Sequence, residues 1–206
     1  VQTSFGVVDY TVFIAPGLLA TSAMNGAIYD STWNVFFKLH ESKLYQGMLA
    51  TPLGPLDVAL GEMIWALLRG LGYALAFLIV TAPLGLVDGI HSIFAIPAAV
   101  IIAFAFASFG MAITSYFQTY QQMGSINLVI LPMFLFSGSL YPISVYPDWL
   151  EFIIRLLPTW QGIELVRYLW FGVWNGALLV HILYFAVMIA TGLYFTTRRL
   201  RHLFMR

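Results

Sequence analysis

Residues Lys38–Glu62 read KLHESKLYQGMLATPLGPLDVALGE and form the one long polar connector between the first two apolar segments of the chain. The sequence has nine basic and nine acidic residues, and this connector holds five of them: Lys38, Glu41, Lys43, Asp57 and Glu62. Long apolar runs flank the connector on both sides. We therefore expect it to lie in water between two segments that are buried in lipid.

Composition supports this division of the chain. Hydrophobic residues make up 61% of the sequence and charged residues only 9%, whereas soluble domains carry about 25% charged residues. A backbone in lipid must satisfy its own hydrogen bonds, which restricts membrane proteins to helical bundles and closed barrels. The apolar runs approach the ~20 residues that a helix needs to cross a bilayer, and the ~10-residue alternating segments of a barrel are not seen. The sequence predicts an all-α integral membrane protein.

The apolar runs predict five transmembrane helices within one domain that comprises residues 1–206. The chain opens with Val1 rather than Met, and a sixth, N-terminal span is expected in the intact protein. The five expected spans cover residues 10–35, 63–86, 93–115, 123–140 and 176–196.

Positive charge predicts the orientation of these spans. Basic residues are enriched in cytoplasmic loops of membrane proteins. With the C-terminus in the cytoplasm, only Arg155 and Arg167 are outside, and six basic residues are inside: Lys38, Lys43, Arg198, Arg199, Arg201 and Arg206. We therefore expect a multi-pass protein of the cell (inner) membrane with a cytoplasmic C-terminus.

The connector on the outer side carries two amphipathic segments. Apolar residues from Trp149 onward recur at helical spacing, and Pro158 separates a first helix at residues 148–157 from a second at 160–171. Both are too short to span, so we expect re-entrant or interfacial extracellular helices. Opposite charges at helical spacing predict ion pairs that hold these helices in shape or act in gating: Glu151 with Arg155, and Glu164 with Arg167.

The sequence contains no recognisable catalytic or ligand-binding constellation. It has no phosphate-binding G-x-x-x-x-G-K-[ST] loop, its four histidines are scattered, and it has no cysteine. Its net charge of zero gives no indication of nucleic-acid binding. We therefore expect no catalytic, cofactor-binding or metal-binding residue in this chain.

Three segments, in order, resemble the transmembrane permease subunit of type 2 ABC exporters, most closely the nodulation-factor and daunorubicin-resistance permeases. They are FIAPGLLATSAM (Phe13–Met24), LATPLGPLDVALGEM (Leu49–Met63) and FSGSLYPISVYPDWLEFIIRLLPTWQGIELVRYLWFG (Phe136–Gly172). The resemblance covers nearly the whole chain except the family's N-terminal amphipathic helix and first span. It implies outward transport of an amphipathic substrate: a lipid, a glycolipid, a lipid-linked saccharide or a hydrophobic drug.

The resemblance also implies partners. A separate ATPase subunit would bind ATP and Mg, and a second copy or a similar permease would complete the path within membrane lipid. The connector would supply a cytoplasmic coupling helix at about residues 37–50. On a helical wheel its contact face comprises Glu41, Leu44, Tyr45, Met48 and Leu49. The alternative interpretation is a helix that lies on the inner leaflet.

Polar residues within the spans are the remaining candidates for functional residues, because a charge inside the membrane is costly and usually has a function. Glu62 and Arg69 either anchor the second span at the membrane edge or line the inner mouth of a substrate path. Arg69 could reach the inner surface or stack on Trp65. Asn25 and Asn127 are interhelical hydrogen bonders or path residues. Asp30 fits a helix-end or interhelical polar partner better than a substrate contact.

The sequence fits two other functions less well. An ion-gradient-driven secondary transporter of hydrophobic compounds usually has carboxylates near mid-bilayer and an internal repeat, and neither is found. A lipid-modifying membrane enzyme needs clustered acids or histidines at one interface, and the acids here are spread over both sides. Both functions fit the sequence less well than that of an exporter permease.

Overall fold

The computed structural model describes residues 2–3, 6–87 and 89–204 of the chain, so that Arg206 lies outside the described residues. Within these ranges the fold is a helical bundle, preceded by one small antiparallel hairpin. Strands β1 (Gln2–Thr3) and β2 (Gly6–Val7) form this hairpin, with Gln2 opposite Val7.

The bundle begins with one long helix and ends with another. The first comprises α1 (Tyr10–Tyr29) and continues into two segments of π-helix, η1 (Asp30–Asn34) and η2 (Phe37–Glu41). The later elements are α2 (Leu44–Leu49), α3 (Pro55–Thr81), η3 (Ile90–Phe94), α4 (Ala95–Thr114), α5 (Tyr120–Leu135), η4 (Ile143–Val145), α6 (Asp148–Leu156), α7 (Pro158–Trp170) and α8 (Ala177–Phe204).

Four helices in the described residues are long and apolar enough to cross a membrane: Tyr10–Glu41, Pro55–Thr81, His91–Thr114 and Ala177–Phe204. These match four of the five expected spans. The fifth, α5, has 16 residues, which corresponds to ~24 Å against a hydrocarbon core of ~30 Å. It was expected to reach residue 140 but ends at Leu135, shortly before Gly138 turns the chain in the left-handed region with φ of 75°.

The expectation of one continuous helix at residues 37–50 is wrong. The first long helix continues to Glu41, and Lys43 then adopts a left-handed conformation with φ of 50° before α2 begins. A left-handed residue interrupts the helical hydrogen-bond ladder and redirects the chain. Residues of η2 and α2 therefore do not share one helical face.

The boundaries of α3 and α8 also differ from the expectation. Helix α3 begins eight residues before the expected span, because Pro55 suits the first helical position and the Asp57 carboxylate accepts a hydrogen bond of 2.8 Å from the Gly54 N–H. It ends at Thr81 rather than at residue 86. Helix α8 continues beyond residue 196 to Phe204, so the basic tail is helical as far as described.

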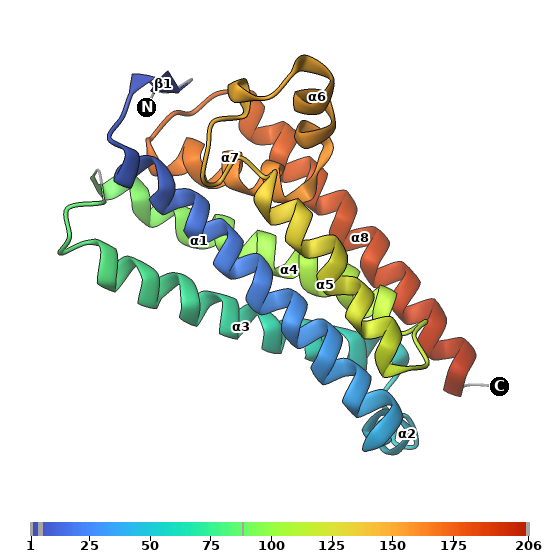
Figure 1. The fold of residues 1–206 in the computed structure, drawn as a ribbon. Helices are drawn as coiled ribbons and strands as arrows, with labels where there is room; N and C mark the ends of the chain where they lie inside the picture. Colours follow the sequence, from blue (N-terminus) through green and yellow to red (C-terminus); the bar gives the residue numbers. More distant parts are fainter. Residues whose placement is uncertain (1, 4–5, 88, 205–206) are drawn as a thin grey trace.

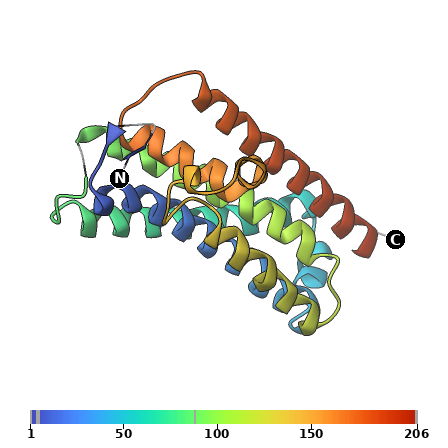
Figure 2. The same ribbon diagram turned by 45° about the horizontal axis from the view of Figure 1, so that its top comes forward.

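Helix α4 forms the centre of the bundle and packs against α1, α3, α7 and α8 (Figures 1 and 2). Its buried positions are rich in alanine, including Ala98, Ala99 and Ala103, which allows close approach of the helix backbones. The hairpin lies at the end of the bundle near α7, and the C-terminus lies at the opposite end with α2 (Figure 1). We name these the α7 end and the α2 end.

Candidate functional site

Tyr45 anchors α2 to the α2 end of the bundle. Its side chain is completely buried, and this burial raises the pKa of its hydroxyl. The hydroxyl lies close to the Glu62 carboxylate but has no hydrogen bond of ordinary geometry. The surrounding cluster draws residues from α2, the first long helix, α3, α4 and α8: Val35, Leu39, Val58, Ala59, Met63, Met111 and Leu200.

The outward side of α2 presents a small exposed surface. Leu44 is 43% exposed, Gln46 and Gly47 are exposed, and Met48 and Leu49 are partly buried against the cluster. The structure thus contradicts the expectation that Tyr45 shares an exposed face with Leu44, because the turn at Lys43 directs Tyr45 inward.

Glu41 is separate from the exposed surface of α2. It belongs to η2, the end of the first long helix, and accepts a hydrogen bond of 3.3 Å from the Tyr120 hydroxyl at the start of α5. The neighbouring His40 Nε2 lies 2.9 Å from the Phe117 carbonyl oxygen. Together these contacts join the end of the first helix to the link between α4 and α5.

An ion pair joins the two helices that flank the connector. Lys38 Nζ lies 2.8 Å from both carboxylate oxygens of Glu62, and both side chains are largely shielded from solvent. From the sequence, Glu62 was expected at the membrane edge or at the inner mouth of a substrate path, without this partner. Opposite charges at the two ends of a hairpin-like connector are the signal that could have indicated the pair.

A second ion pair lies deeper, where α1 passes into the π-helical segment η1. Asp30 is buried and accepts a hydrogen bond from Arg69 of α3. This confirms the expectation that Asp30 is an interhelical partner. Arg69 pairs with it rather than stacking on Trp65 or extending alone to the surface. Single-turn π-helical segments within α-helices frequently occur at functional sites.

A groove of about 670 Å³ between α1 and α3 brings two candidate residues together. Asn25 and Arg69 both line it, together with Ser22, Tyr29, Asp30 and Tyr73. Glu62 lies in a smaller neighbouring cleft that shares Asp30. Asn127 is exposed on α5 and does not line this groove. The groove therefore places polar side chains along two helices of membrane-spanning length.

The outer helices match their expected ranges to within two residues, and both expected ion pairs are present. In α6, Glu151 pairs with Arg155, whose Nε lies 3.1 Å from Oε1, while the preceding Trp149 is 66% exposed. In α7, Arg167 lies 3.1 Å from Glu164.

Helix α7 is nevertheless a part of the bundle core, not a peripheral helix. Arg167 is only 3% exposed, donates a hydrogen bond of 2.7 Å to the Gly138 carbonyl, and lies 4.1 Å above the Phe13 ring of α1. A partly buried hydrogen bond that was not expected, between Gln161 and His181, joins α7 to α8. Arg167 therefore ties α7 to α1 and to the turn after α5.

Comparison with known proteins agrees with this arrangement of long apolar helices around a polar connector. The family model for ABC-2 type transporters matches residues 1–171. The chain therefore belongs to the ABC-2 type transporter family, which comprises membrane transport subunits that normally work with an ATPase subunit.

Its relatives include several proteins named Nodulation protein J. The one from Rhizobium leguminosarum bv. viciae is 32% identical over 205 residues, covering 97% of this chain and 77% of the relative. Those from R. leguminosarum bv. trifolii and Sinorhizobium fredii are each 33% identical, covering 81% and 78% of this chain and 64% and 62% of the relatives. The chain thus spans less than two thirds of these last two relatives. No solved structure gives a significant match.

Proposed function

We propose that this chain is the membrane-spanning permease subunit of an ATP-driven exporter, and that α2 is the point where a separate ATPase subunit docks. The ATPase subunit binds ATP and Mg, and this chain contributes no catalytic group. In this proposal the α2 end and the C-terminus are cytoplasmic, and α5 completes a set of five spans in the cell membrane.

The observation that carries the proposal is the way α2 is held. Its outward surface at Leu44 is exposed, whereas its inward Tyr45 is fixed among residues of the first long helix and α3. The Lys38–Glu62 pair joins the same two helices beside it. A displacement of α2 would therefore move two spans at once. Such coupling is needed if closure of an ATPase on its nucleotide is to change the shape of a transport path.

The groove between α1 and α3 supports a path between two permeases. Arg69 and Asn25 are exposed on the surface of the isolated subunit, yet polar side chains in a membrane almost always face protein or a water-filled cavity. A second permease copy, or a similar permease, placed against this groove would shield these residues and enclose a route. A route with polar walls among apolar helices suits an amphipathic cargo such as a lipid, glycolipid, lipid-linked saccharide or hydrophobic drug.

The docking role of α2 is tested with a matched pair of variants. Leu44→Glu places a charge on the exposed surface of α2, and Leu203→Glu places one on a similarly exposed leucine of α8 at the same end of the bundle. When the ATPase subunit is produced together with the permease, its co-purification from membranes should fall about 30-fold for Leu44→Glu, as for an interface residue worth ~2 kcal/mol. It should persist for Leu203→Glu.

Two results would contradict the proposal. Full recovery of the ATPase subunit with Leu44→Glu would refute docking through α2. Transport of an amphipathic dye into inverted vesicles on an ion gradient, with no ATP, would instead favour the secondary transporter.

A further inference from the structure

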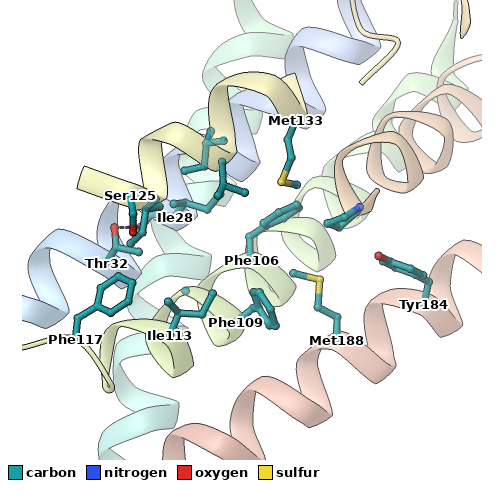
Figure 3. Close-up of a pocket in the computed structure, with 15 residues that line it drawn as sticks. Ile28, Thr32, Phe106, Phe109, Ile113, Phe117, Ser125, Met133, Tyr184 and Met188 are labelled. Carbon is teal, nitrogen blue, oxygen red and sulfur yellow. Dashed lines mark hydrogen bonds between the residues drawn. The ribbon is translucent and has the colours of Figure 1, made fainter. Parts of the chain in front are cut away.

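A second groove, of about 460 Å³, lies on the other side of α4, between α5 and α8 (Figure 3). Phe106, Phe109 and Ile113 of α4 form its floor, with Met133 of α5 on one wall and Met188 of α8 on the other. Almost all of its lining is apolar. The transport path proposed above does not use it.

The character of this lining differs from the helix contacts of the bundle. Membrane helices approach each other closely over small residues, and α4 meets α8 in this way where Gly192 fits against Ser108. The groove is instead lined mostly by long or aromatic side chains. Helices α5 and α8 make little direct backbone contact across it. A groove with such walls suits a slender flexible chain rather than the close approach of another helix.

A basic residue stands at the α2 end of the groove. Arg199 follows Met188 by eleven residues, or three turns, and therefore lies on the same face of α8, ~16 Å closer to the C-terminus. Its Nε donates a hydrogen bond of 3.3 Å to the Ser115 carbonyl, and its guanidinium lies 4.8 Å above the Tyr116 ring, next to Phe117 of the groove.

Among the described residues, no carboxylate forms an ion pair with Arg199. A guanidinium offers five N–H donors, and its planar fork matches the oxygens of a phosphate. Arg199 thus retains donors for an anionic headgroup at the mouth of an apolar groove.

We propose that this groove binds an acyl chain of an anionic phospholipid from the leaflet on the α2 side, and that Arg199 binds the phosphate of that lipid. The ~16 Å between Arg199 and Met188 equals about half of the ~30 Å hydrocarbon core, so a chain descending from the headgroup would reach Met188 within one leaflet. Positive charge at the mouth selects anionic over zwitterionic lipids, and the apolar walls hold the chain.

The test uses the full-length protein in nanodiscs of phosphatidylcholine that contain a trace of phospholipid with a photoreactive diazirine on its acyl chain. Phosphatidylglycerol and phosphatidylcholine probes are compared, and mass spectrometry quantifies the label on peptides that contain Phe106–Phe117 and Tyr184–Met188. Phosphatidylglycerol should label these peptides at least fivefold more than phosphatidylcholine, since one basic residue near a membrane contributes about that factor.

Four variants with unchanged melting temperatures make the result specific. Arg199→Gln should lower phosphatidylglycerol labelling about fivefold, whereas Arg199→Lys should retain most of it. Arg201→Gln removes an exposed charge from the opposite face of α8 and should have no effect. Ile113→Trp fills the groove and should abolish labelling by both probes.

Three outcomes would overturn the proposal. Equal labelling by the two probes would show that the groove has no preference for anionic lipid. Equal losses in Arg199→Gln and Arg201→Gln would assign the preference to diffuse charge at the end of α8. Absence of label from the wild-type groove would mean that a further helix or a second permease copy covers it.

Discussion

Tyr45→Ala distinguishes an anchor of α2 from a docking contact. The Tyr45 side chain is fully buried in a cluster that joins α2 to four other helices of the bundle. Truncating a buried aromatic residue to alanine costs ~3–5 kcal/mol, because contacts are lost and a cavity remains. A loss of ~4 kcal/mol would lower the melting temperature by roughly 8–16 °C for a chain of this length.

Tyr45→Phe is the matched control. The Tyr45 hydroxyl is buried without a hydrogen bond of ordinary geometry, and an unsatisfied buried polar group costs ~1–3 kcal/mol. Removing it while keeping the ring should leave stability unchanged or raise it by up to ~1 kcal/mol.

The assay is thermal unfolding of each purified variant in nanodiscs, followed by co-purification of the ATPase subunit. For an anchor, Tyr45→Ala lowers the melting temperature even without the ATPase subunit, and Tyr45→Phe behaves as wild type in both measurements. The reasoning would be refuted if Tyr45→Ala kept the wild-type melting temperature and lost only the ATPase subunit, since that pattern belongs to an exposed contact.

Two further predictions concern contacts between helices. Lys38→Glu and Glu62→Lys should each destabilise the protein by ~2 kcal/mol, a value between those of exposed and buried ion pairs. In thermal unfolding, the double variant with the two charges exchanged should recover most of this loss. Additive losses would show that the pair contributes nothing to stability. Gly192→Ala places a Cβ 2.6 Å from Ser108 and should lower the stability of the protein by ~1–3 kcal/mol. Gly72→Ala meets open space and should stabilise α3 by up to ~1 kcal/mol. Equal melting temperatures of the two variants would contradict the close packing of α4 on α8.

The spans could be predicted from the sequence because hydropathy is a local property. The runs before Lys38 and after Glu62 are long and apolar by themselves, and four of the five expected spans correspond to helices of membrane-spanning length. The outer helices were also predicted to within two residues, since Pro158 and the helical spacing of charges mark them directly. Family membership followed from ordered motifs and is confirmed by the match over residues 1–171.

The roles of individual polar residues were less predictable. Glu62 was assigned to the membrane edge or to a path, and its partner Lys38 lies 24 positions away, where no helical periodicity connects the two. Asn25 and Arg69 were named separately, and only the packing of α1 against α3 places them in one groove. Arg167 was expected to pair with Glu164 and so hold its own helix in shape or act in gating. Its buried contacts instead extend to α1 and to the turn at Gly138.

Tyr45 shows most clearly what the sequence alone determined and what required the tertiary structure. The sequence alone determined that residues 38–62 form a polar connector between two spans, because the free energy of burying a segment in lipid depends on its own composition. The direction of the Tyr45 side chain depends on the backbone of Lys43, whose φ of 50° lies in the left-handed region. The turn at Lys43 lets Tyr45 enter the cluster between the first helix and α3. Only the tertiary structure supplies that cluster, so only the structure shows that Leu44 is exposed and Tyr45 is not.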